Sequence, residues 1–395
     1  MASSRTVVIA GAGIGGLTAA LALAQRGFGV TLLEQADRLE EIGAGIQLSP
    51  NASRILLALG LGERLKPHIV APDELKVMNA RSGRVLACAP LGAAEQRYGA
   101  PYWVIHRGDL QAALLAAVEA APEIKLRLGS KVDDVAVHRG GVTVAASRSG
   151  RGAEERGIAL VAADGLWSGL RQRLGHRAMP RFAHHAAWRA LAPAEAVPSG
   201  QRAPGVKLWL GQHAHLVHYP VKAGRLINVV AILRDDWREP GWSVPGERAE
   251  ILARFPAGAW HPAPRELLGA AGQWQKWALY DCAPLGRWGR GPVTLLGDAA
   301  HPLLPYLAQG AAMAIEDAAV LADCLGHKPD DPGTALRAYE DRRRDRTARV
   351  QRAARRNGAV YHMGGAATVL RTLAVMAMGG GLLARYDWLY GWKPD

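Results

Sequence analysis

The chain is poor in cysteine, with only three among 395 residues. Cys88, Cys282 and Cys324 lie far apart and show neither a CxxC pair nor metal-ligand spacing. This excludes a disulfide framework, gives no reason to expect a bound metal, and favours a reducing compartment such as the cytoplasm. The first residues also carry no basic region ahead of an apolar segment, so no secretory signal is expected.

Long hydrophobic runs are missing as well. A helix needs about 20 apolar residues to span a bilayer, and the nearest candidate, residues 373–383, is short and interrupted by three consecutive glycines. We therefore expect no membrane partner. A hydrophobic content of 49% is nevertheless sufficient for a large core, and the length favours one or two domains.

Acidic residues are fewer than basic ones, 35 against 48, which gives a net charge of +13. Nine arginines lie in the segment from Arg337 to Arg356. Such a density is found in protein segments that bind nucleic acids or membrane surfaces. Asp341 and Asp345 interrupt this run, apolar residues recur in it at helical intervals, and no nucleic-acid motif accompanies it. We expect a solvated or subunit-facing helix, no nucleic-acid partner, and a field that attracts anionic aromatic acids and NAD(P)H.

Glycine is concentrated near the start of the chain. The sequence GAGIGG follows the strand-like run 7–10 and precedes the helix-like run 17–25. Such a turn lets backbone N–H groups and a helix N-terminus hold a pyrophosphate. Glu34 ends a second strand at 30–33, where a carboxylate accepts hydrogen bonds from an adenosine ribose. The fingerprint glycines are Gly11, Gly13, Gly15 and Gly16.

A second motif indicates which dinucleotide binds. Gly297 and Asp298 follow the apolar run 292–296 and lead through Gly310 into a helix-like segment at 311–324. A carboxylate at the end of a strand suits the hydroxyl groups of a ribityl chain, which flavins have and nicotinamide cofactors lack. The alternative is that Asp298 caps a helix. Together the two motifs predict FAD, in a site assembled from both halves of the chain.

With these motifs the sequence resembles the single-component FAD-dependent aromatic hydroxylases (flavoprotein monooxygenases) over essentially its whole length. The segment 163–171, with Asp164, Ser168 and Arg171, looks like the family's Asp-Gly motif, and 297–302 looks like its Gly-Asp motif. The segments 41–48, 106–110 and 215–220 are similar to the branch of salicylate hydroxylase, 3-hydroxybenzoate 6-hydroxylase and 6-hydroxynicotinate 3-monooxygenase.

The resemblance implies an α/β fold: a Rossmann-like FAD-binding domain interleaved with a β-sheet substrate domain and followed by a C-terminal helical segment. The expected boundaries are 1–178 and 280–332 for the FAD-binding parts, 179–279 for the substrate sheet and 333–395 for the helices. NADH or NADPH is expected as a transient co-substrate, since no second dinucleotide fingerprint is present. The expected FAD contacts are Gly11, Gly13, Gly15, Gly16, Glu34, Gln47, Arg107, Val132, Asp164, Asp298, Gly310 and Ala311.

Hydroxylation by a flavin hydroperoxide requires an electron-rich ring, so a base that converts a phenol into a phenolate favours the reaction. The strand-like segment 212–220 carries three histidines and a tyrosine, and alternation places His215 and Tyr219 on one face and His218 on the other. The family branch has a histidine and a tyrosine four residues apart in its pocket. We expect His215 to act as base or proton relay and Tyr219 to position the substrate oxygen; the alternative, structural strand residues, is preferred for His218.

Pro305 and Tyr306 are expected beside the reacting face of the flavin ring. Salicylate and 3-hydroxybenzoate hydroxylases often carry a glutamine where Pro305 stands, and this difference brings a pyridine-type substrate into consideration. His301 is either structural or close to the flavin.

The sequence therefore predicts an NAD(P)H- and O₂-dependent hydroxylase of a small phenolic or hydroxy-heteroaromatic carboxylate, with or without decarboxylation, acting as a monomer or homodimer. Two alternatives remain open at this point. One is an FAD-dependent oxidase or reductase that inserts no oxygen, and the other is a non-enzymatic flavin sensor or nucleic-acid-binding protein.

Overall fold

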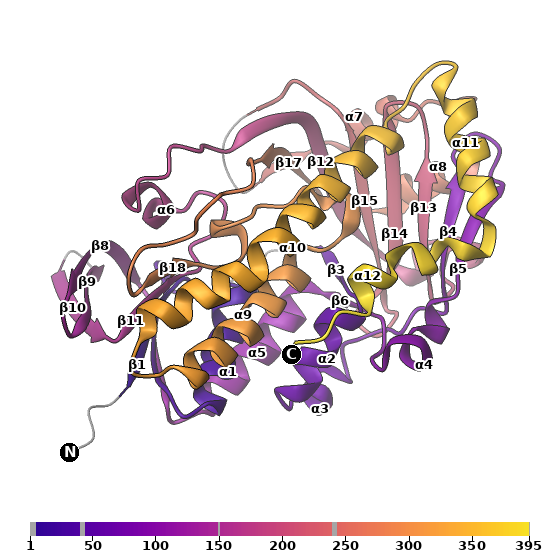
Figure 1. The fold of residues 1–395 in the computed structure, drawn as a ribbon. Helices are drawn as coiled ribbons and strands as arrows, with labels where there is room; N and C mark the ends of the chain where they lie inside the picture. The colour runs from indigo at the N-terminus through magenta and orange to yellow at the C-terminus, as the bar shows by residue number, and fades with distance from the viewer. Residues whose placement is uncertain (1–4, 40–43, 149–150, 239–242, 395) are drawn as a thin grey trace.

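A computed structural model describes residues 5–39, 44–148, 151–238 and 243–394. The first three residues of the 41–48 motif lie outside these ranges. The chain forms two main sheets with helices packed around them, as Figure 1 shows. This is the α/β architecture expected from the sequence.

The first sheet is parallel, in the order β18-β11-β1-β2-β7. Its inner strands are almost continuously apolar because helices cover both faces of a parallel sheet. The bounds are β1 Thr6–Ala10, β2 Gly29–Leu33, β7 Ile124–Arg127, β11 Ala159–Ala162 and β18 Val293–Leu295. The sheet thus joins strands from both ends of the chain, so the dinucleotide fingerprint and the Gly-Asp motif emerge from one layer.

The second sheet has eight strands in the order β16-β17-β12-β15-β14-β13-β4-β5. Its pairs are antiparallel except for β13 with β4. Six strands come from residues 181–281, and β4 and β5 extend the sheet beyond the expected segment 179–279. The bounds are β4 Glu74–Asn79, β5 Val85–Ala89, β12 Arg181–Pro193, β13 Gly205–Leu210, β14 Ala214–Val221, β15 Leu226–Arg234, β16 Val244–Gly246 and β17 Trp274–Asp281.

Two small sheets complete the strands. The ribbon β3 Gly45–Leu48 with β6 Trp103–His106 leads into α5, and a three-stranded sheet at the end of the molecule contains β8 Ser130–His138, β9 Gly141–Arg148 and β10 Arg151–Gly157 (Figure 1). The neighbouring strands β7 and β8 follow each other closely in the chain. They lie in different sheets because the chain turns at Gly129, where φ is +63°.

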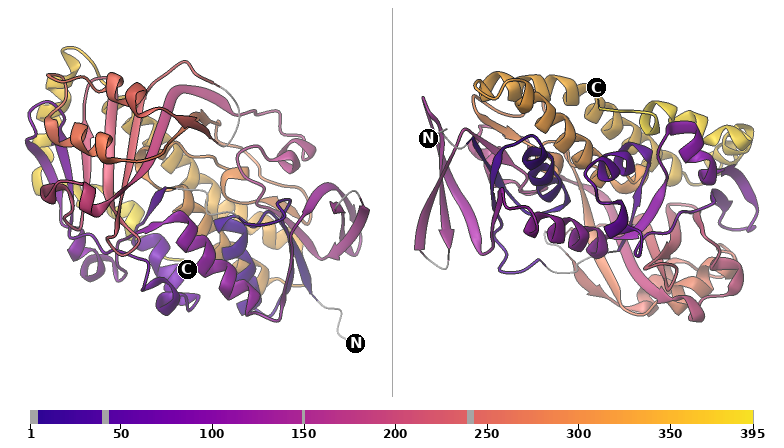
Figure 2. Two further views of the ribbon diagram at one scale, coloured as in Figure 1. Left: turned by 180° about the vertical axis from the view of Figure 1, so that it is seen from behind. Right: turned by 90° about the horizontal axis from the view of Figure 1, so that it is seen from below.

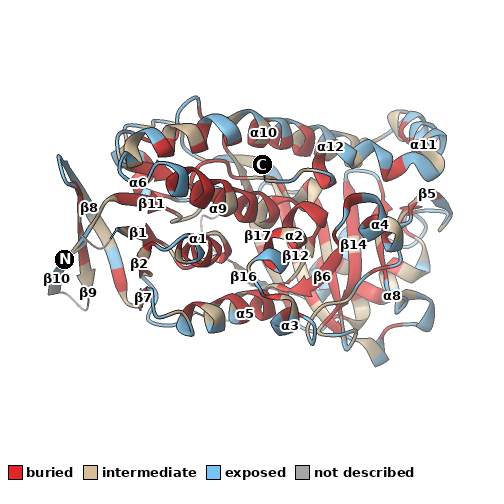
Figure 3. Ribbon diagram, turned by 60° about the horizontal axis from the view of Figure 1, so that its bottom comes forward, coloured by how far each residue is buried: buried red, intermediate tan, exposed pale blue. Residues whose placement is uncertain are grey.

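The helices pack mainly against the parallel sheet and along the large sheet. Figure 3 shows that α1 and α9 are buried over most of their surface, and these two helices pack against each other. The bounds are α1 Ile14–Gln25, α2 Pro50–Ala58, α3 Gly62–Leu65, α4 Ala94–Tyr98, α5 Arg107–Glu119, α6 Gly169–Arg173, α7 Arg248–Arg254, α8 Pro262–Ala270, α9 Gly310–His327, α10 Pro332–Tyr361, α11 Ala367–Met378 and α12 Asp387–Tyr390.

The C-terminal segment is helical, as expected. Helix α10 runs along the molecule from the parallel sheet to the large sheet, and α11 and α12 follow it beside the large sheet, as Figures 1 and 2 show. Within the described ranges, no single helix has the length and apolar character of a membrane span. The adjacent segments Ala367–Leu382 and Ala384–Tyr390, bent by 83°, meet those criteria only together.

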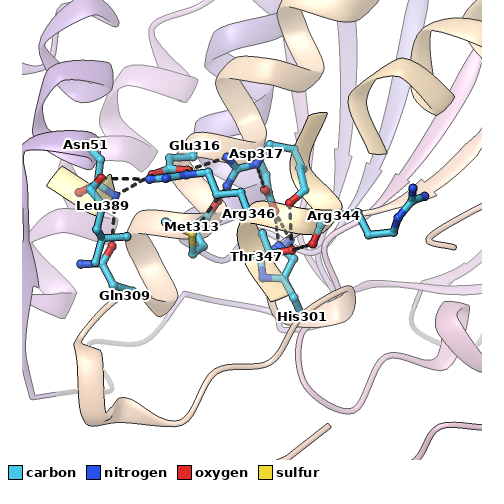
Figure 4. A network of polar contacts seen from close by, with 12 residues as sticks. Asn51, His301, Gln309, Met313, Glu316, Asp317, Arg344, Arg346, Thr347 and Leu389 are labelled. Carbon is cyan, nitrogen blue, oxygen red and sulfur yellow. Dashed lines mark hydrogen bonds and ion pairs between the residues drawn. The ribbon is translucent and has the colours of Figure 1, made fainter. Parts of the chain in front are cut away.

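The arginine-rich helix is solvated on one face, where Arg342, Arg349, Arg352 and Arg356 are exposed, but its other face is buried. Arg343 is fully buried, with its Nη1 2.6 Å from Glu316 Oε2 and its Nε 2.7 Å from Asp317 Oδ1. Arg346 also binds Glu316, at 2.7 Å, and Asn51 Nδ2 donates to Glu316 Oε1 at 2.7 Å; Figure 4 shows Arg346 and Asn51 beside Glu316. The expectation was wrong for this part of the helix because the charges of α10 are matched by acids on α9, which sequence spacing does not reveal.

Candidate functional site

The glycine loop after β1 has the close contacts of a dinucleotide-binding turn. Gly11 has φ of +104°, and a Cβ there would lie 2.4 Å from the Ala163 carbonyl oxygen. A Cβ on Gly16 would lie 1.9 Å from Gly11 O, and one on Gly15 would lie 2.8 Å from Leu296 Cδ2. A Cβ on Gly13, in contrast, would meet no described atom within 4 Å. Three glycines therefore allow internal packing, while Gly13 leaves room for a ligand to approach the backbone.

Two helix N-termini border this loop without side-chain caps. Gly13 precedes α1 and Gln309 precedes α9, and neither helix start shows a capping hydrogen bond from its N-cap side chain. A Cβ on Gly310 would also meet nothing within 4 Å, and Ala311 follows it in the first turn of α9. Uncapped N–H groups and the helix dipole make such ends suitable for phosphate oxygens.

Glu34 follows β2 and contacts the glycine loop directly. Its Oε2 accepts a hydrogen bond from Ala12 N at 2.7 Å, and its Oε1 accepts one from Ala36 N at 2.9 Å. The backbone of Ser130 donates to Glu34 O, which places β8 and Val132 beside the same strand end. Glu34 thus holds the loop in addition to the ribose contact expected for it.

The Asp-Gly segment follows β11, which lies between β1 and β18 in the parallel sheet. Asp164 Oδ2 accepts from Leu170 N at 3.2 Å, whereas its Oδ1 is buried without a partner among the described residues. Arg171 is fully buried and donates to the carbonyl oxygens of Leu166 and Ala299. Arg171 therefore joins this loop to the Gly-Asp loop, and the unpaired oxygen of Asp164 is suited to accept a bond from a ligand.

Asp298 lies shortly after β18, near Arg107 and His301. Solvent reaches its side chain, yet desolvation by surrounding protein raises its pKa, opposed by His301 and Arg107. Desolvation likewise lowers the pKa of Arg107, with Asp298 acting against it. Their mutual effect shows that the carboxylate of Asp298 and the guanidinium of Arg107 lie close to each other.

These features fit FAD as one cradle. The open backbone at Gly13 and Gly310 suits a pyrophosphate, Glu34 suits a ribose, and the exposed carboxylate of Asp298 after β18 suits ribityl hydroxyl groups. Most of the residues expected to contact FAD lie at the ends of β1, β2, β11 and β18 or in the segments that follow them. Gln47 and Arg107 come instead from the β3–β6 ribbon and the helix that follows it.

A separate cavity, of about 110 Å³, lies between the large sheet and the C-terminal segment. Its size is of the order of a cavity that holds benzene, about 150 Å³, which favours a ligand with one aromatic ring. Most of its wall is apolar, with the amide of Gln47 and several tyrosines as polar groups. The lining includes Gln47, Leu75, Val77, Tyr102, Leu208, His215, Val217, Pro305, Tyr306, Asn357, Tyr361, Leu383, Tyr386 and Tyr390.

His215 is the histidine that the fold places in this cavity. It lies on β14, is 2% exposed, and has its Nδ1 3.0 Å from His362 Nε2. The Tyr306 ring lies 5.7 Å away, centroid to centroid. Burial lowers the pKa of His215 well below its usual value, and the neighbouring His362, His185 and Arg371 act in the same direction. His215 is therefore neutral near pH 7, so one of its ring nitrogens carries a lone pair.

Tyr219 and His218 occupy different surroundings. Tyr219 shares the His215 face of β14 but is not among the described side chains that line the cavity. It packs over Gly45, where a Cβ would lie 2.5 Å from its ring, and burial raises its pKa, opposed by Arg189 and Gln47. His218 faces the opposite side of the sheet near Trp209, at 6.5 Å between ring centroids. The pairing of His215 with Tyr219 at the substrate stays a prediction.

The loop before α9 forms one cavity wall with an unusual backbone. Pro305 and Tyr306 both line the cavity, and Ala308 beside them has φ of +52°, a conformation that favours glycine. Gln309 fixes the loop, since its Nε2 donates to Ser49 Oγ at 2.8 Å and its Oε1 accepts from Asn51 at 3.1 Å. This polar anchoring is what holds the left-handed residue in place.

His301 belongs to the buried ion network. Its Nε2 lies 2.6 Å from Asp317 Oδ2, which also accepts from Gly297 N at 3.0 Å. This geometry supports the structural interpretation of His301. Through Asp317, it also connects the Gly-Asp loop to Arg343 on α10.

Sequence reasoning missed the wall that the C-terminal segment contributes. Asn357, Tyr361, Tyr386 and Tyr390 line the cavity, and His362 contacts His215 from the end of α10. No motif marks these residues. Their only sequence signal is a set of aromatic and polar residues in a segment that is otherwise basic or apolar.

Comparison with known proteins gives consistent matches. Residues 4–354 match the family model described as FAD binding domain. The 3-hydroxybenzoate 6-hydroxylase of Klebsiella oxytoca is 38% identical over 100% of this chain and 98% of its own length. The 6-hydroxynicotinate 3-monooxygenase of Pseudomonas fluorescens is 36% identical over 89% of this chain and 91% of its own. A salicylate hydroxylase substrate complex superposes with a TM-score of 0.82 at 28% identity, covering 100% of this chain and 97% of that one.

Proposed function

Because this chain belongs to the family of FAD-binding aromatic hydroxylases, we propose that its substrate is a small phenolic or hydroxy-heteroaromatic carboxylate with a single ring. The resemblance recognised in the sequence is confirmed, and the protein is an FAD-dependent aromatic monooxygenase that uses NAD(P)H and O₂. The observation that supports the substrate class is the neutral, buried His215 in a cavity the size of one ring.

The bound flavin, once reduced by NAD(P)H, supplies the activated oxygen. His215 accepts the proton of the substrate hydroxyl group, which raises the electron density of the ring at the position to be attacked. Pro305 and Tyr306 limit where the ring can lie, and the apolar side chains of the cavity exclude water. The protein's own contribution is thus to orient the ring and to remove one proton.

The polar wall indicates how a carboxylate is held. No Lys or Arg occurs among the described residues that line the cavity, whose donors are the amides of Gln47 and Asn357 and several tyrosine hydroxyl groups. Tyr102 already donates to Gln47 Oε1 at 2.6 Å, which fixes that amide. We propose that neutral donors bind the carboxylate, so that binding depends on hydrogen bonds in a cavity of low polarity.

The alternative of an oxidase or reductase without oxygen insertion does not require a base in the cavity. His215 and its buried partner therefore favour hydroxylation. Against the nucleic-acid alternative, Arg343 and Arg346 of the arginine-rich helix bind Glu316 on α9 and are thus paired within the protein.

The deciding experiment is a substrate panel with the FAD-loaded enzyme. 3-Hydroxybenzoate, salicylate and 6-hydroxynicotinate are each tested with NADH and NADPH, and cofactor oxidation, oxygenated product and hydrogen peroxide are measured together. We expect at least one of these acids to give product nearly equal to the NAD(P)H oxidised. If every acid accelerated NAD(P)H oxidation but yielded only hydrogen peroxide, the proposed substrate class would be wrong.

Three further assignments are proposals of the same kind. We place the enzyme in the cytoplasm because its three cysteines are free thiols and its electron donor is NAD(P)H. We propose a monomer or homodimer. We also propose that no nucleic acid is a partner.

A further inference from the structure

A second, larger hollow lies behind His215, on the side away from the substrate cavity. Its volume is about 450 Å³, and it is bordered by His184, His213 and Arg234, which are exposed to solvent. His362 and Tyr306 line it as well, and Tyr306 also lines the substrate cavity. Tyr306 and the hydrogen-bonded pair of His215 and His362 therefore connect the walls of the two hollows.

The hydrogen bond between His215 and His362 joins these walls. His215 Nδ1 is 3.0 Å from His362 Nε2, so Nε2 is the nitrogen that His215 has left for a substrate. The bond can run in either direction, depending on which ring carries the proton. His362 Nε2 is also 3.3 Å from the carbonyl oxygen of Ile232, which stabilises a proton once it has arrived there.

The surroundings keep both rings neutral until a proton enters. Burial lowers the pKa of His362 to about 3, with the neighbouring His185 acting in the same direction and the carbonyls of Ile232 and Gly358 opposing it. His185 stacks on His362 at 4.3 Å between centroids, Tyr306 lies edge-on at 5.5 Å, and Arg371 contributes positive charge from α11. No carboxylate is among these neighbours, so a proton is not retained on the pair.

We propose, on the basis of the proposed function, that His362 is a positioning residue and proton relay that carries the substrate hydroxyl proton from His215 to the second hollow. The hydroxyl proton moves to His215 Nε2 while the proton on His215 Nδ1 moves to His362 Nε2. His362 then loses its Nδ1 proton to water. Each step moves one proton and changes no oxidation state.

The last step requires a small motion. His362 Nδ1 is buried without a hydrogen-bond partner among the described residues, although its ring borders the second hollow. The terminal torsion of histidine is broad, so a ring rotation can bring Nδ1 to the water in that hollow. A buried nitrogen without a partner costs stability, and water in that hollow can supply the partner after the rotation.

The test follows the proton without needing turnover. Oxidised FAD-loaded enzyme is mixed in a stopped-flow instrument with 3-hydroxy-4-nitrobenzoate, whose phenolate absorbs visible light, in weak buffer containing a pH indicator. We expect His362→Gln to slow phenolate formation and proton release by roughly tenfold or more. Binding of the methoxy analogue, which has no proton to lose, stays unchanged.

Two further variants separate a relay from a structural role. Imidazole should restore the rate of His362→Ala in proportion to its free-base concentration, because a small base can enter the second hollow, whereas a packing defect would not respond. His184→Asn is the matched control: it removes an exposed imidazole from the same hollow at a position with φ of +55°, which Asn tolerates, and should leave the rate unchanged.

The outcomes distinguish the relay from the proposed function. A wild-type rate in His362→Gln with FAD fully bound, or no rescue of His362→Ala by imidazole, overturns the relay. If His215→Gln slows ionisation and His362→Gln does not, only the relay is wrong. If none of the acids in the panel is hydroxylated but the nitrophenol ionises through both histidines, the substrate assignment fails and the relay stands.

Discussion

Two neighbouring arginines of α10 should differ sharply in their effect on stability. Arg343 is fully buried and pairs with two fully buried acids, whereas the Arg344 side chain is 35% exposed and pairs with Asp341 on the surface. Removing one partner of a buried ion pair costs about 3–5 kcal/mol, because the other charge remains buried. A surface pair three residues apart on a helix contributes about 0.5 kcal/mol or less.

The identical substitution to Met at each position isolates this difference. Glu316 keeps Arg346 and Asp317 keeps His301 in Arg343→Met, so we expect the lower end of that range, about 3 kcal/mol. At about 2 °C per kcal/mol for a large domain, the melting temperature falls by roughly 6 °C, against about 1 °C or less for Arg344→Met.

The measurement is thermal unfolding of the FAD-loaded enzyme, followed by tryptophan fluorescence and flavin release. Arg343→Met should also release flavin earlier than the wild type, because Asp317 holds Gly297 N in the flavin-binding loop. Equal shifts for the two variants would refute the conclusion that burial of the pair, rather than helix charge, determines the effect.

Three other predictions concern the cofactor, the base and acid stability. Asp298→Ala should weaken FAD retention measured by flavin fluorescence, and unchanged affinity would remove its role at the ribityl chain. His215→Gln should lower product formation by about 10²–10⁴ and divert NAD(P)H to hydrogen peroxide, with FAD still bound. Burial, aided by Lys207, lowers the pKa of His218 to about 3. The contribution of the neutral His218 side chain to folding stability is therefore complete above pH 6.5 and decreases as pH falls. At pH 5, 1.5 pH units below the unfolded value, the loss is about 2 kcal/mol, and urea unfolding of His218→Leu should show a flatter dependence on pH.

The absence of a nucleic-acid partner is tested by binding assays. Any association with DNA should be negligible at about 0.15 M salt and fall steeply as salt rises. Tight, sequence-selective binding would contradict the purely enzymatic assignment.

The sequence was most informative where the chain must approach a ligand or itself closely. Gly11 and Gly16 are required by contacts of 2.4 Å or less, and the strand–glycine–helix order reveals them without any tertiary information. The strand at 212–220 was predicted for a related reason, since alternation identifies a strand and its faces. Alternation placed His215 and His218 on opposite faces, and the resemblance indicated that the face of His215 meets the cavity.

Features that depend on distant packing were not predictable. β4 joins β13 in parallel although about 130 residues separate them, and the pairing adds two strands to the substrate sheet. His362 reaches His215 across 147 residues of chain. No local spacing encodes either contact, because each joins residues that are distant in the chain.

The basic charge of α10 acquires a functional explanation from the position of this helix. Arg343 and Arg346 fasten the middle of the helix to Glu316 and Asp317 on α9, and the first turn of α9 lies in the expected flavin cradle. The end of α10 carries Asn357, Tyr361 and His362 to the substrate cavity. The ion network thereby fixes the distance between the flavin-binding half and the proton-accepting wall. Since hydroxylation requires both to be held in one geometry, the buried arginines contribute to catalysis by positioning, although none of them lines the cavity.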